Sequence, residues 1–183
     1  RDTIWLSRDL QLLLPEPSAL GQPLSASQLV SGQYQDQNFS SQFQVELSQH
    51  KLVLMALATW GPPLFSATLT PDSLITNQAR VAKVEVKYML ADLLITYLPY
   101  KALKQSLKGR KLKIVETTTR REIWLDKKLI ISVDYTATTA KQSRWYGQVQ
   151  YHNHMRNYQL EINTLALTLA SIPNKPSASQ LEP

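Results

Sequence analysis

Two of the three histidines, His152 and His154, are two residues apart, a spacing that puts both rings on one face of a strand. Imidazoles on one face can begin a metal site, but such a site needs further ligands. No third ligand stands beside them, and the nearby Asn153 and Asn157 are typical of a turn. We therefore expect a hairpin turn here and no bound metal.

Residues for covalent or acid–base catalysis are scattered. The G-x-S-x-G pattern of a nucleophilic serine is absent, and the chain has no cysteine. Asp92, inside a predicted helix, and Asp134, on a predicted strand, are the acid–base candidates, and a lone aspartate in such a place is expected to be solvated. Neither G-x-G-x-x-G nor G-x-x-x-x-G-K occurs. We expect neither an enzyme nor a cofactor.

Basic residues are concentrated between Lys101 and Lys128, which hold ten lysines and arginines against three acids. The net charge of the whole chain is only +6. Such a stretch favours phosphate or anionic lipid, and a solvated face of the fold is the alternative. Arg120, Arg121 and Trp124 form a basic and aromatic mixture of the kind that binds nucleic acid. Without a recognised module, however, we expect no nucleic-acid partner.

Alternating apolar residues predict strands on both sides of one helical block. Between about residues 29 and 81, and again between 112 and 169, apolar side chains recur at every second position. Residues 51–59 are apolar on both faces, which predicts a strand at the centre of the sheet. The connections look short enough for hairpins, so the sheet should be antiparallel.

The helical block covers residues 86–107 and carries one apolar stripe, formed by Val86, Leu90, Leu93, Leu94 and Tyr97. Pro99 interrupts the helix, and Gly109 is expected to end a second, shorter one. An apolar stripe must pack on the sheet, so we expect the helices to cover its inner face. The predicted fold class is mainly β (α+β), with helices over a curved antiparallel sheet.

The length of 183 residues and an apolar share of 43% are typical of one globular domain. We expect this domain to span residues 1–171, followed by a flexible C-terminal tail at 172–183, which is rich in proline, serine and polar residues. The longest apolar stretch, 88–98, is too short to cross a bilayer. Because the chain starts at Arg1 without methionine, we expect that an upstream segment has been removed.

The segment between two predicted strands, Thr59 to Phe65, carries Trp60, Leu64 and Phe65. Large apolar side chains in a connection either fold inward or are presented to an apolar partner. Two prolines between them stiffen the segment. Inward packing and presentation are both open at this point.

The order of parts between residues 32 and 167 resembles the LolA/LolB lipoprotein-carrier fold, and LolB in particular. The resemblance is carried by Lys51-Leu-Val-Leu, Gly61-Pro-Pro-Leu-Phe and Leu98-Pro-Tyr-Lys-Ala-Leu, together with the order of strands and helices. The chain also resembles, more closely, bacterial lipoproteins of LolB type that are encoded among aryl-polyene genes.

This resemblance implies an eleven-stranded antiparallel half-barrel with helices in its concave side and a cavity for acyl chains. It implies a periplasmic protein anchored to the outer membrane by a lipidated cysteine just before Arg1, a residue that this chain does not contain. In LolB a protruding loop with an apolar tip helps transfer lipoproteins to the membrane. The matching residues here are Trp60, Leu64 and Phe65, with Leu64 as the expected tip.

We therefore expect a non-enzymatic, monomeric carrier or acceptor of a lipid-like or lipoprotein acyl ligand at the inner leaflet of the outer membrane. The alternatives are an accessory or scaffold protein for lipid or aryl-polyene biosynthesis and, with less support, a lipid hydrolase. A carrier or biosynthetic protein is the expected protein partner. The residues expected to face the ligand cavity are Phe43, Val45, Leu54, Leu69, Leu90, Leu94, Tyr97, Ile131, Val133, Val149 and Ile162.

Overall fold

The computed structural model of the protein describes residues 2–34, 36–58, 60–78, 85–136 and 143–170. Within these residues, ten strands form one antiparallel sheet and three form a small second sheet. The strands are β1 (Thr3–Ser7), β2 (Leu10–Leu13), β3 (Leu24–Tyr34), β4 (Gln37–Leu47), β5 (Leu52–Leu57), β6 (Phe65–Leu69), β7 (Leu74–Gln78), β8 (Leu107–Gly109), β9 (Leu112–Glu116), β10 (Arg120–Leu125), β11 (Lys128–Tyr135), β12 (Gln148–Asn153) and β13 (Tyr158–Leu169). The helices are a 3-10 turn η1 (Pro17–Leu20), α1 (Val86–Tyr97) and α2 (Tyr100–Ser106).

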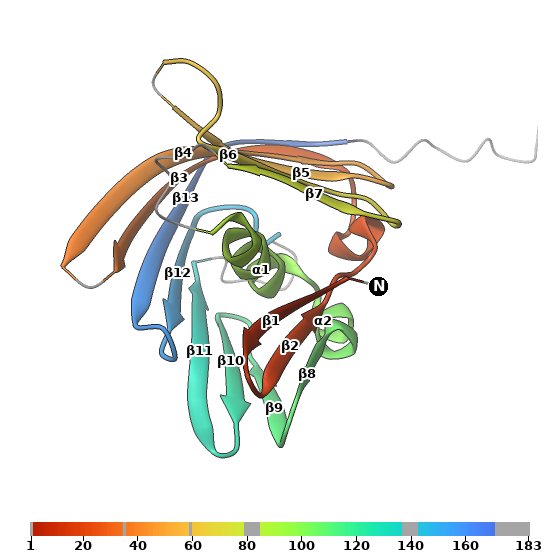
Figure 1. Ribbon diagram of the computed structural model, residues 1–183, viewed down its shortest axis with the longest axis vertical. Coiled ribbons are helices and arrows are strands. Elements are labelled where there is room, and N and C mark those ends of the chain that lie inside the picture. The colour runs from red at the N-terminus through yellow and green to blue at the C-terminus, as the bar shows by residue number, and fades with distance from the viewer. Residues whose placement is uncertain (1, 35, 59, 79–84, 137–142, 171–183) are drawn as a thin grey trace, which may run out of the picture.

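The large sheet bends around α1, as Figure 1 shows, and its strand order explains how the chain closes it. The order is β7-β6-β5-β4-β3-β13-β12-β11-β10-β9, so the first and last strands of this sheet pair at its centre. From β3 the chain runs outward to one edge at β7, and it resumes at the opposite edge with β9. The connection between the edges, which contains α1 and α2, therefore crosses the concave side.

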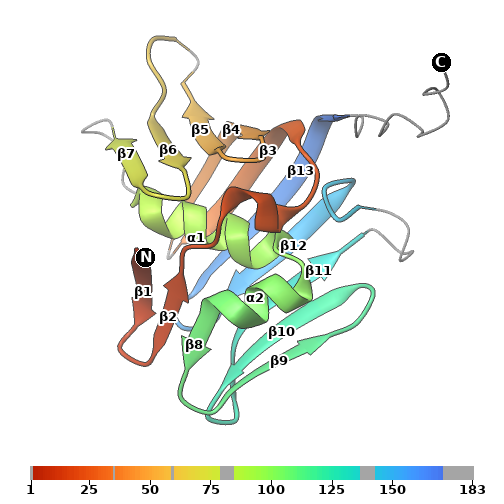
Figure 2. The ribbon, with the colours of Figure 1, turned by 90° about the vertical axis from the view of Figure 1, so that its right-hand side faces the viewer.

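Helix α1 is enclosed on nearly every side, because ten of its twelve residues are buried. The large sheet covers it on one side, and the small sheet β1-β2-β8 lies on the other (Figures 1 and 2). More of the helix is therefore buried than the single apolar stripe predicted from the sequence. Because the helix is covered on both sides, Ala91 and Ile95 are inaccessible although they lie outside the predicted stripe, and so are the polar Asp92 and Thr96.

The predicted fold class is confirmed: the protein is mainly β, with a large curved antiparallel sheet and two α-helices in the described residues. The sheet differs from the eleven-stranded expectation, since it has ten strands among these residues and the other three form a separate sheet. No helix of the described residues is long and apolar enough to cross a membrane. The expected C-terminal tail, 172–183, lies outside the described residues.

Two local predictions are wrong. Strand β5 was expected at the centre of the sheet, but it is third from the β7 edge. Its outward side chains are half-buried, which agrees with their apolar character. The centre is β3 with β13, and β3 was hard to recognise because Ala26 and Gln28 occupy inward positions. Gly109 was expected to end α2, but this helix stops at Ser106. Gly109 is instead closely packed, because a Cβ there would lie only 2.9 Å from a methyl of Leu125.

Candidate functional site

The structure brings all eleven residues that were expected to face a ligand into one buried apolar core, where none is more than 7% exposed. They come from the concave face of the large sheet and from the side of α1 that meets it. A buried apolar layer between a sheet and a helix also follows from folding alone. Their role as ligand contacts therefore stays a prediction.

The space between α1 and the sheet is nearly filled. A hollow of about 20 Å³ lies there, which is room for about one water molecule. Its lining is formed by Gln28, Val30, Phe43, Leu54, Met89, Asp92, Leu93, Tyr97, Leu160 and Ile162. Four of the predicted residues, Phe43, Leu54, Tyr97 and Ile162, thus border the hollow. An acyl chain could enter only if α1 or its side chains moved.

Asp92 is the unexpected member of this lining, because the carboxyl group is buried and not solvated as predicted from its place in a helix. It is 4% exposed and accepts a hydrogen bond from the Tyr158 hydroxyl, whose oxygen lies 2.7 and 2.8 Å from the two carboxyl oxygens. Burial raises the pKa of Asp92 to about 7, against the opposing effects of neighbouring hydroxyl groups and Arg156. Near neutral pH this side chain is therefore part protonated.

Two further side chains complete the cluster around Asp92. The Tyr151 hydroxyl is buried and makes no hydrogen bond among the described residues, and burial is the main cause that raises its pKa. Arg156 stacks on the Tyr88 ring of α1 at 3.6 Å and donates a hydrogen bond to the Leu6 carbonyl. The cluster thus connects α1 with β1, β12 and β13.

The C-terminal end of α1 is held by buried donors from the sheet. Arg121 is 0% exposed, and its Nη1 donates a 2.6 Å hydrogen bond to the Ile95 carbonyl. The Tyr135 hydroxyl donates to the Thr96 carbonyl at 2.7 Å. The last carbonyls of a helix have no partner inside the helix and must find one when they are buried. These two side chains supply such partners, and we call them the α1 clamp.

The charge of Arg121 is balanced by Glu116, which accepts hydrogen bonds from Nε and Nη2 at 3.2 and 3.0 Å. Arg144 also pairs with Glu116 and stacks on the Tyr135 ring at 3.9 Å. Arg121 therefore faces the core and is not accessible to a partner, although the sequence grouped it with Arg120 and Trp124. Arg121 lies two residues before the buried Ile123, and this alternation is the signal that could have placed it inside.

Within the β5–β6 loop, the three predicted residues occupy different environments. Trp60 is 89% exposed, on a loop that projects from the sheet (Figure 1). Leu64 is half-buried against the core, and its backbone N–H bonds to the Ala56 carbonyl. Phe65 is buried, with its ring edge-on to Phe43 at 5.4 Å. The apolar tip is therefore Trp60 and not Leu64.

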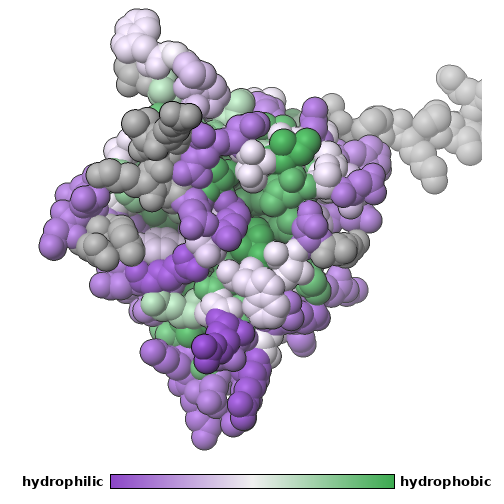
Figure 3. Space-filling model, in the orientation of Figure 1, coloured by the Kyte–Doolittle hydropathy of each residue, from purple (hydrophilic) through white to green (hydrophobic). Residues whose placement is uncertain are grey.

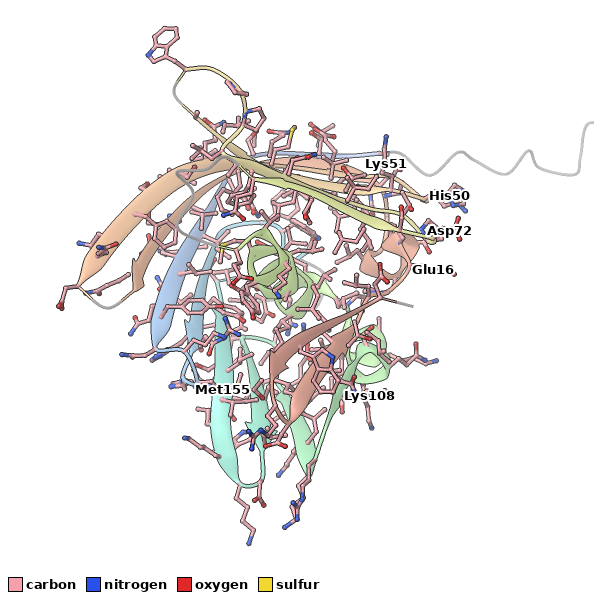
Figure 4. All side chains as sticks on the ribbon, in the orientation of Figure 1. Glu16, His50, Lys51, Asp72, Lys108 and Met155 are labelled. Carbon is pink, nitrogen blue, oxygen red and sulfur yellow. The ribbon has the colours of Figure 1, made fainter. Side chains whose placement is uncertain are left out.

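Two other polar sites lie away from α1. A hollow of about 280 Å³ lies between the N-terminal segment and the β6–β7 turn, and its lining includes Leu69, Glu16 and Asp72. Figure 4 shows Glu16 and Asp72 near each other at this edge of the molecule. The rings of His152 and His154 stack at 3.7 Å, but the described residues contain no group of three possible ligands around a metal.

The fold and the interior define a class of protein in which a curved antiparallel sheet wraps around one buried helix. The chain belongs to the family described as "Protein of unknown function (DUF3261)", whose model matches residues 25–166. A comparison with curated proteins found no match.

Several solved structures are similar to the chain. One is a LolA superfamily protein from Nitrosomonas europaea, with a TM-score of 0.48, 8% identity, and coverage of 88% of this chain and 90% of that one. Another is a DUF1329 family protein from Desulfovibrio piger, with a TM-score of 0.41, 7% identity, and coverage of 84% and 88%. A third is an outer membrane lipoprotein-sorting protein domain from Vibrio parahaemolyticus, with a TM-score of 0.41, 8% identity, and coverage of 88% and 87%.

The α1 clamp makes a prediction for two adjacent arginines. Arg121→Met should lower the free energy of unfolding by about 3–5 kcal/mol, because it leaves a helix carbonyl and Glu116 without their buried partner. Arg120→Met is the matched control: this side chain lies partly exposed between Glu122 and Asp134, and its loss should cost about 1 kcal/mol or less. Urea unfolding measures both values, and equal losses would contradict the clamp.

Asp92 makes a prediction for the pH dependence of stability. Because its pKa is higher in the folded protein than in the unfolded chain, its contribution is fully present below about pH 4 and is lost as the pH rises through 7. Asp92→Asn removes this contribution. Wild type should therefore lose roughly 2–4 kcal/mol relative to the variant between about pH 4 and pH 8. Parallel curves from urea unfolding at several pH values would show that Asp92 is not buried in this way.

Proposed function

We propose that this protein binds an acyl or other lipid-like chain non-covalently between α1 and the concave face of the large sheet. The observation that carries the proposal is that one helix covers an apolar concave face and connects the two edges of the sheet. A chain that takes over part of the contacts of α1 is hidden from water on the sheet side. Binding of this kind needs no nucleophile and no cofactor.

The free energy gained by burying an acyl chain is similar in size to the free energy of folding. Burial of one methylene group contributes about 0.8 kcal/mol, so a chain of about 16 carbons gains roughly 12 kcal/mol. The whole folding free energy of a domain is typically about 5–15 kcal/mol. Displacing one helix from its packing costs part of that amount. A long acyl chain can therefore offset the opening, whereas a short apolar molecule cannot.

The contacts of α1 suggest which half would move. Its C-terminal end is held by the α1 clamp, with charged and fully buried groups. The N-terminal half is held to the sheet by the Asp92–Tyr158 hydrogen bond and by the Tyr88–Arg156 stacking. A neutral carboxyl is easier to separate from its partners than a buried ion pair. In the proposal, the N-terminal half moves and the clamped end stays in place.

The proposal places the protein in the periplasm, where it acts as a monomer anchored to the outer membrane by a lipidated cysteine that precedes this chain. Trp60 would contact the inner leaflet and receive or deliver the ligand there. The resemblance to lipoproteins encoded among aryl-polyene genes extends the set of ligands to a polyene chain. A scaffold role in such biosynthesis is the alternative, and it requires no bound lipid.

Lipid uptake is the property that tests the proposal. Protein purified from a bacterial periplasm should release a lipid that mass spectrometry detects, and it should bind an apolar fluorescent dye that carries an alkyl chain of about 16 carbons. Met89→Trp fills the hollow beside α1 and should weaken dye binding about tenfold, a loss of about 1.4 kcal/mol. Lys101→Trp places the same side chain on the exposed surface of α2, outside the hollow, and should leave binding unchanged. Absence of both lipid and dye binding would favour the scaffold.

The β5–β6 loop gives a second test, with two variants that should behave oppositely. Trp60→Ser removes an exposed side chain, so the melting temperature should stay near that of wild type. The free energy of binding to phosphatidylcholine vesicles should become less favourable by about 2 kcal/mol. Leu64→Glu places a carboxylate against the core and should destabilise the fold by about 1–3 kcal/mol. Thermal melts and vesicle sedimentation measure both effects. Unchanged vesicle binding of Trp60→Ser would remove the loop from the mechanism.

A further inference from the structure

The β8–β9 turn, which joins the two sheets, and the β10–β11 turn of the large sheet meet at one end of the molecule, where exposed basic side chains gather. The backbone N–H of Asp126, in the β10–β11 turn, lies 3.4 Å from the carbonyl of Lys111, in the β8–β9 turn, and their side chains form an ion pair at 3.3 Å. Around this contact stand six exposed cations, which we call the basic tip: Lys108, Arg110, Lys111, Lys113, Lys127 and Lys128. Figure 4 shows Lys108 at its margin, and Figure 3 shows strongly hydrophilic residues gathered over this end.

Two lysines of the basic tip have backbone conformations that are unfavourable for this residue type. Asp126 and Lys127 have φ of 47° and 65°, and Lys111 has φ of 50°. This left-handed region is unfavourable for side chains other than glycine, asparagine and aspartate. A tight hairpin turn such as β10–β11 prefers Asp-Gly, so Lys127 occupies the place where glycine would be favoured. Residues in disfavoured conformations occur preferentially at sites of function.

The positive charge of the basic tip is largely uncompensated. Of its six cations, Lys111 alone forms an ion pair among the described residues, with Asp126. Of the other basic side chains of the same stretch, Arg121 is inside the core and Arg120 pairs with Glu122 and Asp134. Lys101 and Lys104 are exposed on α2, apart from the two turns. Residues 101–128 are therefore neither one long basic face nor a wholly neutralised one. Their charge is concentrated at the two turns.

The basic tip lies at the opposite end of the molecule from the β5–β6 loop. The loop is at the top and the tip at the bottom in both Figure 1 and Figure 2, along the longest axis of the molecule. A single flat membrane cannot contact both ends at once. Any role of the tip is therefore separate from that proposed for Trp60, and does not depend on it.

We propose that the basic tip docks the protein onto an anionic lipid bilayer through the phosphate groups of the lipids. Clusters of four to eight lysines and arginines at a membrane surface bind acidic lipids. Two short turns form a narrow convex end, whereas a stable protein–protein interface buries about 800 Å² on each partner. Electrostatic adsorption to a charged surface needs accessible charges and no such area. The geometry thus favours a bilayer over an acidic protein.

Vesicle binding of charge-reversed variants tests this docking surface. Arg110→Glu with Lys127→Glu changes one residue in each turn, and Lys51→Glu with Lys101→Glu makes the same change of net charge away from the tip. On vesicles of phosphatidylglycerol and phosphatidylcholine, the tip variant should bind at least about 25-fold more weakly than wild type, because each engaged cation contributes roughly a factor of five. The control variant should bind like wild type. Binding should weaken steeply with salt as the Debye length falls from about 30 Å at 0.01 M.

Orientation on the vesicle gives a second, independent readout. The chain has no cysteine, so single substitutions Lys127→Cys and Trp60→Cys can each carry one polarity-sensitive fluorophore. When phosphatidylglycerol is added to phosphatidylcholine vesicles, the emission of the label at 127 should change, and that of the label at 60 should stay as it is on phosphatidylcholine alone. Equal loss of binding in both charge variants, or a response of the label at 60 alone, would overturn the proposal. So would binding of the tip to polyglutamate with none to vesicles, which would assign it to an acidic protein.

Discussion

The hydrogen bond from Arg121 to the Ile95 carbonyl, together with that from Tyr135 to Thr96, is the constraint on which this fold depends. A helix can cross the interior of a sheet only if its terminal carbonyls keep partners there, since buried backbone groups without partners are costly. The donors come from β10 and β11, in the half of the sheet that follows α1 in the chain. The helix therefore cannot be fully buried until this later half of the sheet has formed, which makes the two halves of the chain interdependent.

Dense packing around α1 has a consequence for function. A preformed cavity would let a ligand enter without rearrangement, but here the space is filled by the side chains of the helix itself. Such an arrangement stabilises the protein without ligand, because no large apolar surface is left in water. It also selects for long chains, because only a large apolar area compensates for the displaced packing. Asp92 lies where this exchange would begin, and the raised pKa of its carboxyl makes the neutral form accessible near pH 7, which lowers the cost of separating α1 from β13.

Much of the fold could be predicted from residue patterns, and the failures have physical causes. Strands β4 and β11 were predicted correctly from their alternating apolar residues, as was the break of the helices at Pro99, although four consecutive residues of β11 are buried. The interior polar groups were not, because a buried Arg121 or Asp92 differs from an exposed one only through partners that are distant in sequence, such as Tyr158 for Asp92. Leu64 and Trp60 also could not be distinguished from the sequence, because both are apolar and lie in one loop. In the structure a backbone hydrogen bond to Ala56 holds Leu64 beside the sheet, and Trp60 projects outward.

Pairing between strands also decides how charge is displayed. The stretch from Lys101 to Lys128 looks uniform in sequence, yet the pairing of β10 with β11 sets Arg120 against Asp134, and its pairing with β9 sets Arg121 against Glu116. The six cations of the basic tip lie in the two turns and at the strand ends beside them, where Asp126 alone pairs with one of them among the described residues. The apolar loop follows the same rule, since it too is a connection that the sheet cannot cover. The two exposed features of unlike chemistry therefore lie at opposite ends of the molecule, each at a connection and not on the face of a strand.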